Sequence, residues 1–304
     1  MKPASVVLIA LASAALGAVL GGAYVARRDG AAAPATPDTA AAAASRATTP
    51  AHDASAALPD YVSIGSERVS FEALRRRAAS DPAFLRGLMQ RYRDQTEPVA
   101  RGELLALLNA VSGEEVLRFA LSLTASTRAE DERDGLALLA AYPMDRAEVR
   151  DTLLAKLGQG GDPQRMGELV AMLTPATMAS EDAAPVIAEL ATLARHPDPA
   201  LRAQAVLQLA QWDDGEQAED LLHRAILDSS AEVRAKAIAG IQGSHIRSDR
   251  LKEALLAIAA DPASSAADRG AATFALQQFR LNRAEYGIWR RAQAQADADS
   301  GEGG

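Results

Sequence analysis

The stretch "HPDPALRAQAVLQLAQW", His196 to Trp212, decides the fold because the chain repeats it. "DSSAEVRAKAIAGI", Asp228 to Ile241, has the same order: an Asp, a short gap, an aliphatic residue, an Arg, an Ala-rich run and spaced aliphatic residues. With Arg202 aligned on Arg234, the stretches match at Leu201 and Val233, Ala203 and Ala235, Ala205 and Ala237, Val206 and Ile238, and Leu209 and Ile241. This aliphatic spacing marks one face of a helix.

Further copies of the pattern extend the repeat in both directions. A weaker copy begins at Asp261, with Arg269, Ala272, Thr273 and Leu276 in register. "AEVRDTLLAKL", Ala147 to Leu157, is an earlier copy, and "PVARGELLALL", Pro98 to Leu108, is a fifth candidate. Spacings of 32 and 35 residues between Arg202, Arg234 and Arg269 fit a unit of two helices. Because one such unit cannot cover its own apolar face, the units are expected to stack.

The Asp followed by Val or Leu, Arg and, three residues after that Arg, an Ala resembles the HEAT repeats of the armadillo-type class. The resemblance covers residues 185–280 well and residues 61–174 loosely, since the gap from Arg150 to Arg202 is too long for one unit. In that family Asp and Arg form a ladder between neighbouring repeats. The resemblance therefore implies a structural role for Asp198, Arg202, Asp228, Arg234, Asp261 and Arg269. A cluster of Arg that binds an acidic ligand is the alternative.

Composition agrees with an all-α fold. Only 4% of the 304 residues are aromatic and β-branched residues are few, while Ala, Leu and Arg, which favour helices, are abundant. No convincing run of alternating β-branched residues predicts a strand. We expect a solenoid of antiparallel helix pairs, with helices that start near residues 67, 82, 97, 114, 128, 146, 163, 181, 199, 216, 230, 248, 265 and 283.

The N-terminal segment predicts a membrane anchor. Lys2 precedes the uncharged run "PASVVLIALASAALGAVLGGAYVA", Pro3 to Ala26, and about twenty apolar residues can cross a bilayer as a helix. A cleaved signal peptide is the alternative, although its apolar core is usually shorter. We interpret residues 1–26 as a single-pass anchor, and residues 27–60, rich in Ala, Pro and Thr, as a disordered linker.

The remaining chain divides by the strength of the repeat. Residues 61–174 are expected to form irregular helical repeats, residues 175–293 HEAT-like repeats, and residues 294–304 a disordered acidic tail. Charges flank the anchor almost evenly, and we expect an inner-membrane protein whose body lies in the periplasm. Gly17 and Gly21 have the spacing with which two membrane helices approach closely, so a homodimer through them is a further hypothesis.

Motifs for catalysis, cofactors and metals are missing from the sequence. The chain has no Cys, none of its four His lies three or four residues from another His, and no phosphate-binding glycine loop or serine-nucleophile motif is present. The net charge of −8 argues against general binding to nucleic acid, which needs a basic surface. We expect no cofactor, no metal site, no catalytic residue and no enzymatic activity.

The concave face of a solenoid is its usual binding surface, lined by the second helix of each pair. Here that face is expected to carry Gln204, Gln208, Gln211, Lys236 and Gln277, which suit a protein partner. Tyr286 and Trp289 are expected to seal the last repeat. The leading hypothesis is a membrane-tethered protein-binding scaffold at the bacterial cell envelope. The alternatives are a membrane-anchored folding helper for a secreted client and an enzyme or lyase subunit.

Overall fold

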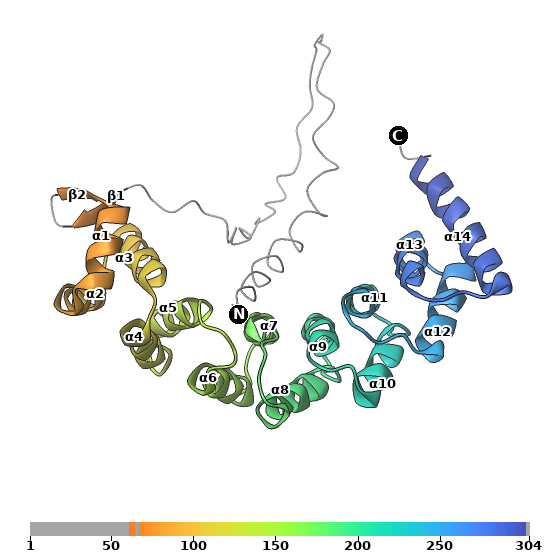
Figure 1. Ribbon diagram of the computed structural model, residues 1–304, viewed down its shortest axis with the longest axis horizontal. Helices are drawn as coiled ribbons and strands as arrows, with labels where there is room; N and C mark the ends of the chain where they lie inside the picture. The colour runs from red at the N-terminus through yellow and green to blue at the C-terminus, as the bar shows by residue number, and fades with distance from the viewer. Residues whose placement is uncertain (1–60, 65–66, 302–304) are drawn as a thin grey trace, which may run out of the picture. The chain divides into compact units, whose positions relative to one another are not determined.

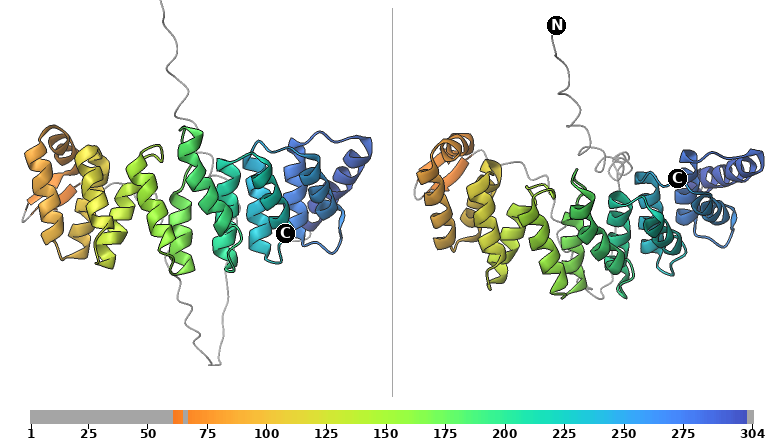
Figure 2. Two further views of the ribbon diagram at one scale, coloured as in Figure 1. Left: turned by 90° about the horizontal axis from the view of Figure 1, so that it is seen from below. Right: turned by 60° about the horizontal axis from the view of Figure 1, so that its bottom comes forward.

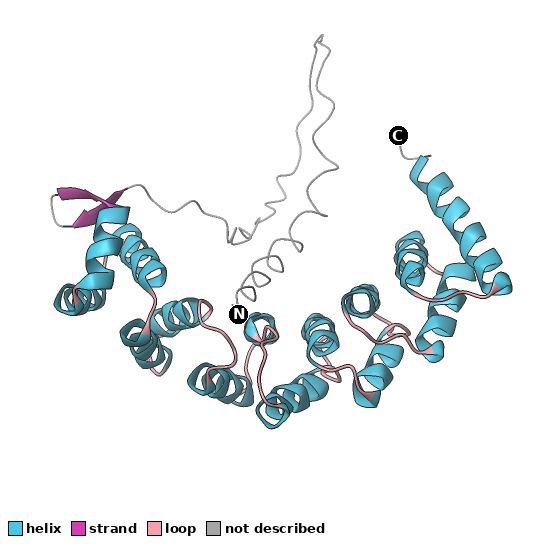
Figure 3. Ribbon diagram, viewed as in Figure 1, coloured by secondary structure: helices cyan, strands magenta, loops and turns pink. Residues whose placement is uncertain are grey.

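The computed structural model describes residues 61–64 and 67–301, which belong to one compact unit that runs from Ala57 to Gly304. The described part of this unit holds fourteen α-helices, one short 3-10 helix and one two-stranded sheet (Figure 1, Figure 3). The predicted helical repeat is therefore confirmed.

The elements follow one another with short connections. In chain order they are β1 (Tyr61–Ile64), β2 (Glu67–Ser70), α1 (Phe71–Ser80), α2 (Pro82–Asp94), α3 (Pro98–Val111), α4 (Glu114–Thr124), α5 (Ala129–Leu139), α6 (Ala147–Gly158), α7 (Pro163–Met172), α8 (Ser180–Leu193), α9 (Pro199–Trp212), α10 (Glu216–Ala225), α11 (Ala231–Gly243), α12 (Asp249–Ala260), α13 (Ala266–Ala275), η1 (Leu276–Gln278) and α14 (Arg283–Gly301). From α2 onward, each observed helix begins within one residue of its predicted start.

The helices of this unit stand in two curved rows (Figure 1, Figure 2). Helices α3, α5, α7, α9, α11 and α13 form the inner row, and α2, α4, α6, α8, α10 and α12 form the outer row. Along the inner row α7 packs on α9, α9 on α11 and α11 on α13, while α9 also packs on α8 and α10 of the outer row. Aliphatic side chains between the rows form the core, including Val206, Leu209 and Ile241, each at most 1% exposed.

Asp before Pro sets the start of three helices. The carboxylates of Asp81, Asp162 and Asp198 accept hydrogen bonds from backbone N–H groups in the first turns of α2, α7 and α9. The Pro that follows has no N–H group. This costs no hydrogen bond, because the first N–H groups of a helix have no acceptor within the helix. Asp261 uses the same geometry to shape a turn, since it accepts from Ala263 N (2.9 Å), and α13 begins only after Ser265.

A β-hairpin precedes the helices. The sequence pattern does not predict this hairpin. β1 and β2 pair antiparallel with Val62 opposite Val69, and the side chain of Val62 is fully buried. The first helix consequently begins at Phe71 and not near residue 67. Each strand is only four residues long, too short for its alternation of apolar and polar residues to stand out.

The C-terminal segment also differs from its prediction. Helix α14 runs to Gly301, so the tail that was expected to be disordered over residues 294–304 is helical as far as residue 301. Its "AQAQA" run, Ala292 to Ala296, consists of good helix formers, and these outweigh the acidic residues that follow.

The predicted anchor at residues 1–26, including Gly17 and Gly21, and the linker at residues 27–60 lie outside the described residues. Among those that are described, no helix is both long enough and apolar enough to cross a bilayer.

Two glycines allow neighbouring helices to approach closely. A Cβ atom placed on Gly135 of α5 would lie 2.5 Å from the backbone nitrogen of Thr124, at the end of α4. A Cβ on Gly240 of α11 would lie 2.8 Å from the Cβ of Ala210 on α9. These positions require glycine because any side chain would push the two helices apart.

We therefore expect Gly135→Ala to lower the free energy of unfolding by about 2 kcal/mol through overpacking against backbone atoms. Gly270→Ala is the matched control. No atom lies within 4 Å of a Cβ at Gly270, within α13, so this change is expected to raise stability by about 0.5–1 kcal/mol. Chemical denaturation of both variants measures the difference, and an equal effect of the two would contradict the close approach.

Candidate protein-binding surface

An arginine occupies the fourth position of five helices, α3, α6, α9, α11 and α13. These residues are Arg101, Arg150, Arg202, Arg234 and Arg269. Because the position within the helix is constant, most of these guanidinium groups reach back toward the turn that precedes their helix. Four of them, all but Arg101, donate to backbone carbonyls in that turn.

Arg202 connects three segments. Its Nη1 donates to the carbonyl of His196 (2.7 Å) and of Pro197 (3.1 Å), in the turn before α9. Its Nε and Nη2 donate to the two carboxylate oxygens of Asp228 (2.9 and 3.0 Å), in the turn before α11. A two-point bond of this kind between charged groups fixes distance and orientation together. Arg202 thereby sets the start of α9 against the start of α11.

Arg234 repeats this arrangement one unit later with a different acceptor. Its Nη1 donates to the carbonyls of Asp228 (2.9 Å) and Ser229 (3.1 Å), and its Nη2 donates to Asp268 Oδ2 (2.7 Å). The resemblance had implied Asp261 for the ladder, but Asp261 shapes the turn before α13, and Asp268 within α13 is the acceptor.

The N-terminal repeats hold their arginines in other ways. Arg101 is 5% exposed, donates to Asp131 (2.7 Å) and Asp134 (2.8 Å), and lies 4.1 Å from the centre of the Tyr92 ring. Burial raises the pKa of the Tyr92 hydroxyl well above its usual range, so this hydroxyl stays protonated and donates to Asp134. Both carboxylates come from α5, so this cluster fixes α3 against α5.

Arg150 explains the long gap in the sequence repeat. It lies on α6, in the outer row, and its Nη2 donates to Asp182 on α8 of the same row (3.2 Å). The next arginine of the pattern, Arg202, lies on α9 in the inner row. The ladder thus changes rows between α6 and α9, and the spacing from Arg150 to Arg202 contains the extra helix α7.

An open groove of about 680 Å3 lies where α7 and the first half of α9 run side by side in the inner row. It is lined by Asp162, Pro163, Gln164, Gly167, Glu168, Ala171, Asp198, Ala200, Leu201 and Gln204. Three of these residues carry carboxylates, namely Asp162, Glu168 and Asp198, and two carry amides. The lining of the groove therefore combines these three carboxylates, which we call its acidic rim, with small apolar side chains.

The acidic rim arises from helix capping. Asp162 accepts from the backbone N–H of Arg165 (3.2 Å), and Asp198 accepts from that of Leu201 (2.9 Å). The cationic side chain of Arg165 is engaged elsewhere, because its Nη2 lies 2.5 Å from Glu132 of α5. Asp198 is also close enough to Arg202 for their charges to interact, and that guanidinium is bound to both carboxylate oxygens of Asp228.

Residues 187–277, from α8 to η1, match the family of HEAT repeats. The chain carries HEAT repeats. The ladder of Arg202, Asp228 and Arg234 lies within the matched segment. No curated protein matches the chain.

The five candidate residues of the HEAT-repeat array do not form one surface. Gln204 lines the groove between α7 and α9, Gln211 is exposed further along α9, and Lys236 is half-buried on α11. Gln277 is exposed in η1 and lines a separate groove beside α14. The structure therefore places only Gln204 and Gln277 at hollows.

Gln208 was expected on the exposed face and is buried, with 6% of its surface exposed. Its Nε2 lies 3.4 Å from the carbonyl of Ala171 on α7 and donates to it. One turn further, Trp212 Nε1 donates to the carbonyl of Leu173 (2.7 Å). Gln208 is buried because α7 lies against this face of α9. It joins the two helices below the groove and is not available to a partner.

The contribution of α7 to the groove was missed from the sequence. Asp162-Pro163 was interpreted only as the start of a helix, and nothing in the sequence indicated that α7 would pack beside α9. Among the described residues, no group of three or more His, Cys, Asp or Glu side chains could hold a metal ion.

The ladder predicts a stability difference between two Arg–Asp pairs that both connect neighbouring repeats. We expect Arg202→Met to lower the free energy of unfolding by about 2–3 kcal/mol, because it leaves the carboxylate of Asp228, 17% exposed, without its cation. Arg250→Met is the control, since Arg250 and Asp220 are 47% and 54% exposed, and it is expected to cost less than about 1 kcal/mol. Equal losses in urea denaturation would contradict a special role for the ladder.

The same pair predicts a dependence on pH. The hydrogen bonds from Arg202 hold the pKa of Asp228 below its ordinary value. A carboxylate with a lowered pKa in the folded state stabilises the fold above its unfolded pKa of about 4, and this stabilisation is lost as the pH falls through the folded value. We therefore expect Asp228→Asn to be less stable than the wild type at neutral pH and to approach it below about pH 4. A difference that stays constant over this range would contradict the assignment.

Proposed function

We propose that the chain is a non-enzymatic protein-binding scaffold, tethered to the bacterial inner membrane, that holds a segment of a partner protein in the groove between α7 and α9. HEAT repeats commonly mediate contacts between proteins, and their helical array is a fold that is usually non-catalytic. The observation that carries the proposal is the acidic groove in the inner row.

The lining of the groove specifies the chemistry of the partner. The carboxylates of Asp162, Glu168 and Asp198 attract Lys or Arg, and the amides of Gln164 and Gln204 can donate to and accept from an extended backbone. The exposed Ala171 and Ala200 offer small apolar contacts. An extended or helical segment with basic residues beside small apolar ones fits these features.

The proposed location of the scaffold at the membrane is inferred from the sequence alone. Residues 1–26 are long and apolar enough to anchor the chain, and about thirty residues of linker give a flexible tether a span of roughly 30 Å. Such a tether would let the HEAT repeats reach partners at the membrane surface or near it. We further propose that the helical repeats lie in the periplasm.

A bulky side chain placed in the groove should block the partner and so tests whether the groove binds it. Gly167 lies on the groove, and no atom lies within 4 Å of a Cβ there, so Gly167→Trp fills the groove without displacing the core. Gly87→Trp on α2 of the outer row is the matched control, because its Cβ position is equally open. Both variants are compared with the wild type by in-cell crosslinking, affinity capture and mass spectrometry.

We expect one dominant partner on the wild type and on Gly87→Trp, reduced at least about tenfold on Gly167→Trp. A broad set of secreted proteins captured transiently would instead favour the folding helper. A partner retained on Gly167→Trp, or no partner on any form, would contradict the groove as the binding surface.

The anchor has its own test. The full chain is expected to stay in the membrane pellet after extraction with alkaline carbonate, because a spanning apolar helix resists this treatment. A variant that lacks residues 2–26 is expected to move to the supernatant. If the mature protein is found in the supernatant with its N-terminal segment removed, the segment is a cleaved signal peptide and the tether is wrong.

A further inference from the structure

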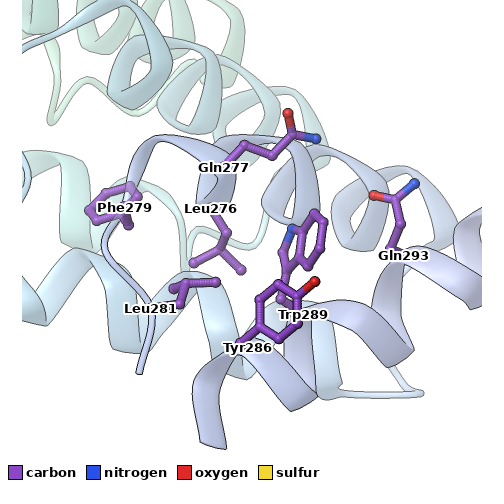
Figure 4. Close-up of a pocket in the computed structure, with 7 residues that line it drawn as sticks. All are labelled: Leu276, Gln277, Phe279, Leu281, Tyr286, Trp289 and Gln293. Carbon is purple, nitrogen blue, oxygen red and sulfur yellow. The ribbon is translucent and has the colours of Figure 1, made fainter. Parts of the chain in front are cut away.

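A second groove lies at the C-terminal end of the array, between the segment after α13 and helix α14 (Figure 4). It has a volume of about 520 Å3. The residues that line it are Leu276, Gln277, Phe279, Leu281, Tyr286, Trp289 and Gln293. Five of the seven are apolar or aromatic, in contrast to the acidic lining of the groove between α7 and α9.

Two aromatic rings form a platform in this groove. Tyr286 and Trp289 stack with their centres 5.5 Å apart and their planes 29° from parallel. The indole is held in place, since Trp289 Nε1 donates to the carbonyl of Thr273 on α13 (2.9 Å). Tyr286 is 51% exposed, so much of its ring is available for contact. An exposed, oriented aromatic ring beside a hollow is a typical anchor point of a protein interface.

Arginines surround the platform. Arg283, Tyr286, Arg290 and Gln293 follow one another at spacings of three and four residues, so they share one face of α14. Tyr286 and Gln293 line the groove, and Arg283 and Arg290 therefore lie on its side of the helix. Arg280 belongs to the segment that forms the opposite wall.

The charges of these arginines are not neutralised within the described part of the chain. Arg280, Arg283 and Arg290 are all exposed, and none of them forms an ion pair with a described carboxylate. By contrast, Arg101, Arg150, Arg202 and Arg234 are each paired with an Asp. Three arginines without a described carboxylate partner thus lie beside an apolar hollow.

We propose that the groove between η1 and α14 binds an acidic segment of a partner protein that inserts an aromatic side chain beside Tyr286 and Trp289. Carboxylates of that segment pair with Arg283 and Arg290, and the aromatic side chain is buried against the platform. The proposal goes beyond the scaffold function, because it uses another surface of opposite charge and does not depend on the groove between α7 and α9.

The test uses fluorescence anisotropy of short labelled peptides with the full protein in detergent. The binding probe has a central Trp with several Glu on each side. One comparison peptide has Lys in place of Glu, and another has Ala in place of Trp. The protein variants are Tyr286→Ala, the double charge reversal Arg283→Glu with Arg290→Glu, and the control Arg118→Glu. Arg118 is likewise exposed and lies on α4, outside the groove.

We expect the Glu peptide to bind and both comparison peptides to bind at least about tenfold more weakly. Tyr286→Ala and the double reversal are expected to weaken binding by about tenfold or more, while Arg118→Glu and Gly167→Trp leave it unchanged. Added salt should weaken binding as well. The unchanged circular dichroism of each variant confirms that it is folded.

Three results would overturn this proposal. The first is no binding of the Glu peptide to the wild type. The second is binding that survives the double reversal. The third is displacement of the peptide by vesicles of anionic lipid that bind the same arginines more tightly, which would assign the groove to a membrane surface. Because Gly167→Trp is tested in parallel, failure here is distinguishable from failure of the proposed scaffold function.

Discussion

The ion pairs between neighbouring repeats are the constraint on which this structure depends. A stack of small aliphatic helices has little in its core that fixes the distance between one unit and the next, because Ala and Leu can pack in many ways. Arg202 removes this freedom by binding two carbonyls before its own helix and both oxygens of Asp228 before α11. One unit later Arg234 binds two carbonyls before α11 and one carboxylate oxygen of Asp268 within α13. The inner helices are thereby held side by side in a defined register.

The groove between α7 and α9 forms where these two helices pack side by side in the inner row. Asp162 and Asp198 cap the N-terminal ends of these two helices, and both line the groove. The capping residues therefore also supply two of its carboxylates. Gln208 and Trp212 then join α9 to α7 beneath it. Helix capping and the lining of the groove therefore share Asp162 and Asp198. A change that alters the packing of α7 on α9 is expected to alter the groove as well.

Features set by residues close together in the sequence could be predicted from it, whereas contacts between distant segments could not. The starts of the helices from α2 onward and the positions of the repeated arginines follow from local rules, and the sequence predicts them closely. The acceptor of Arg234 was not predicted, because Asp261 and Asp268 are both near the start of α13 and only the three-dimensional turn distinguishes them. Gln208 has the spacing of an exposed residue and is buried because α7, distant in the sequence, covers it.

The most direct test of the account is site-specific photocrosslinking in living cells, with a photoreactive residue at Gln204 in the groove and, as the comparison, at the exposed Ala188 on α8 of the outer row. The account predicts a crosslink to one defined protein from position 204 and none to it from position 188. Crosslinks to that protein from position 188 alone, or equally from both positions, would contradict a partner bound in the inner groove.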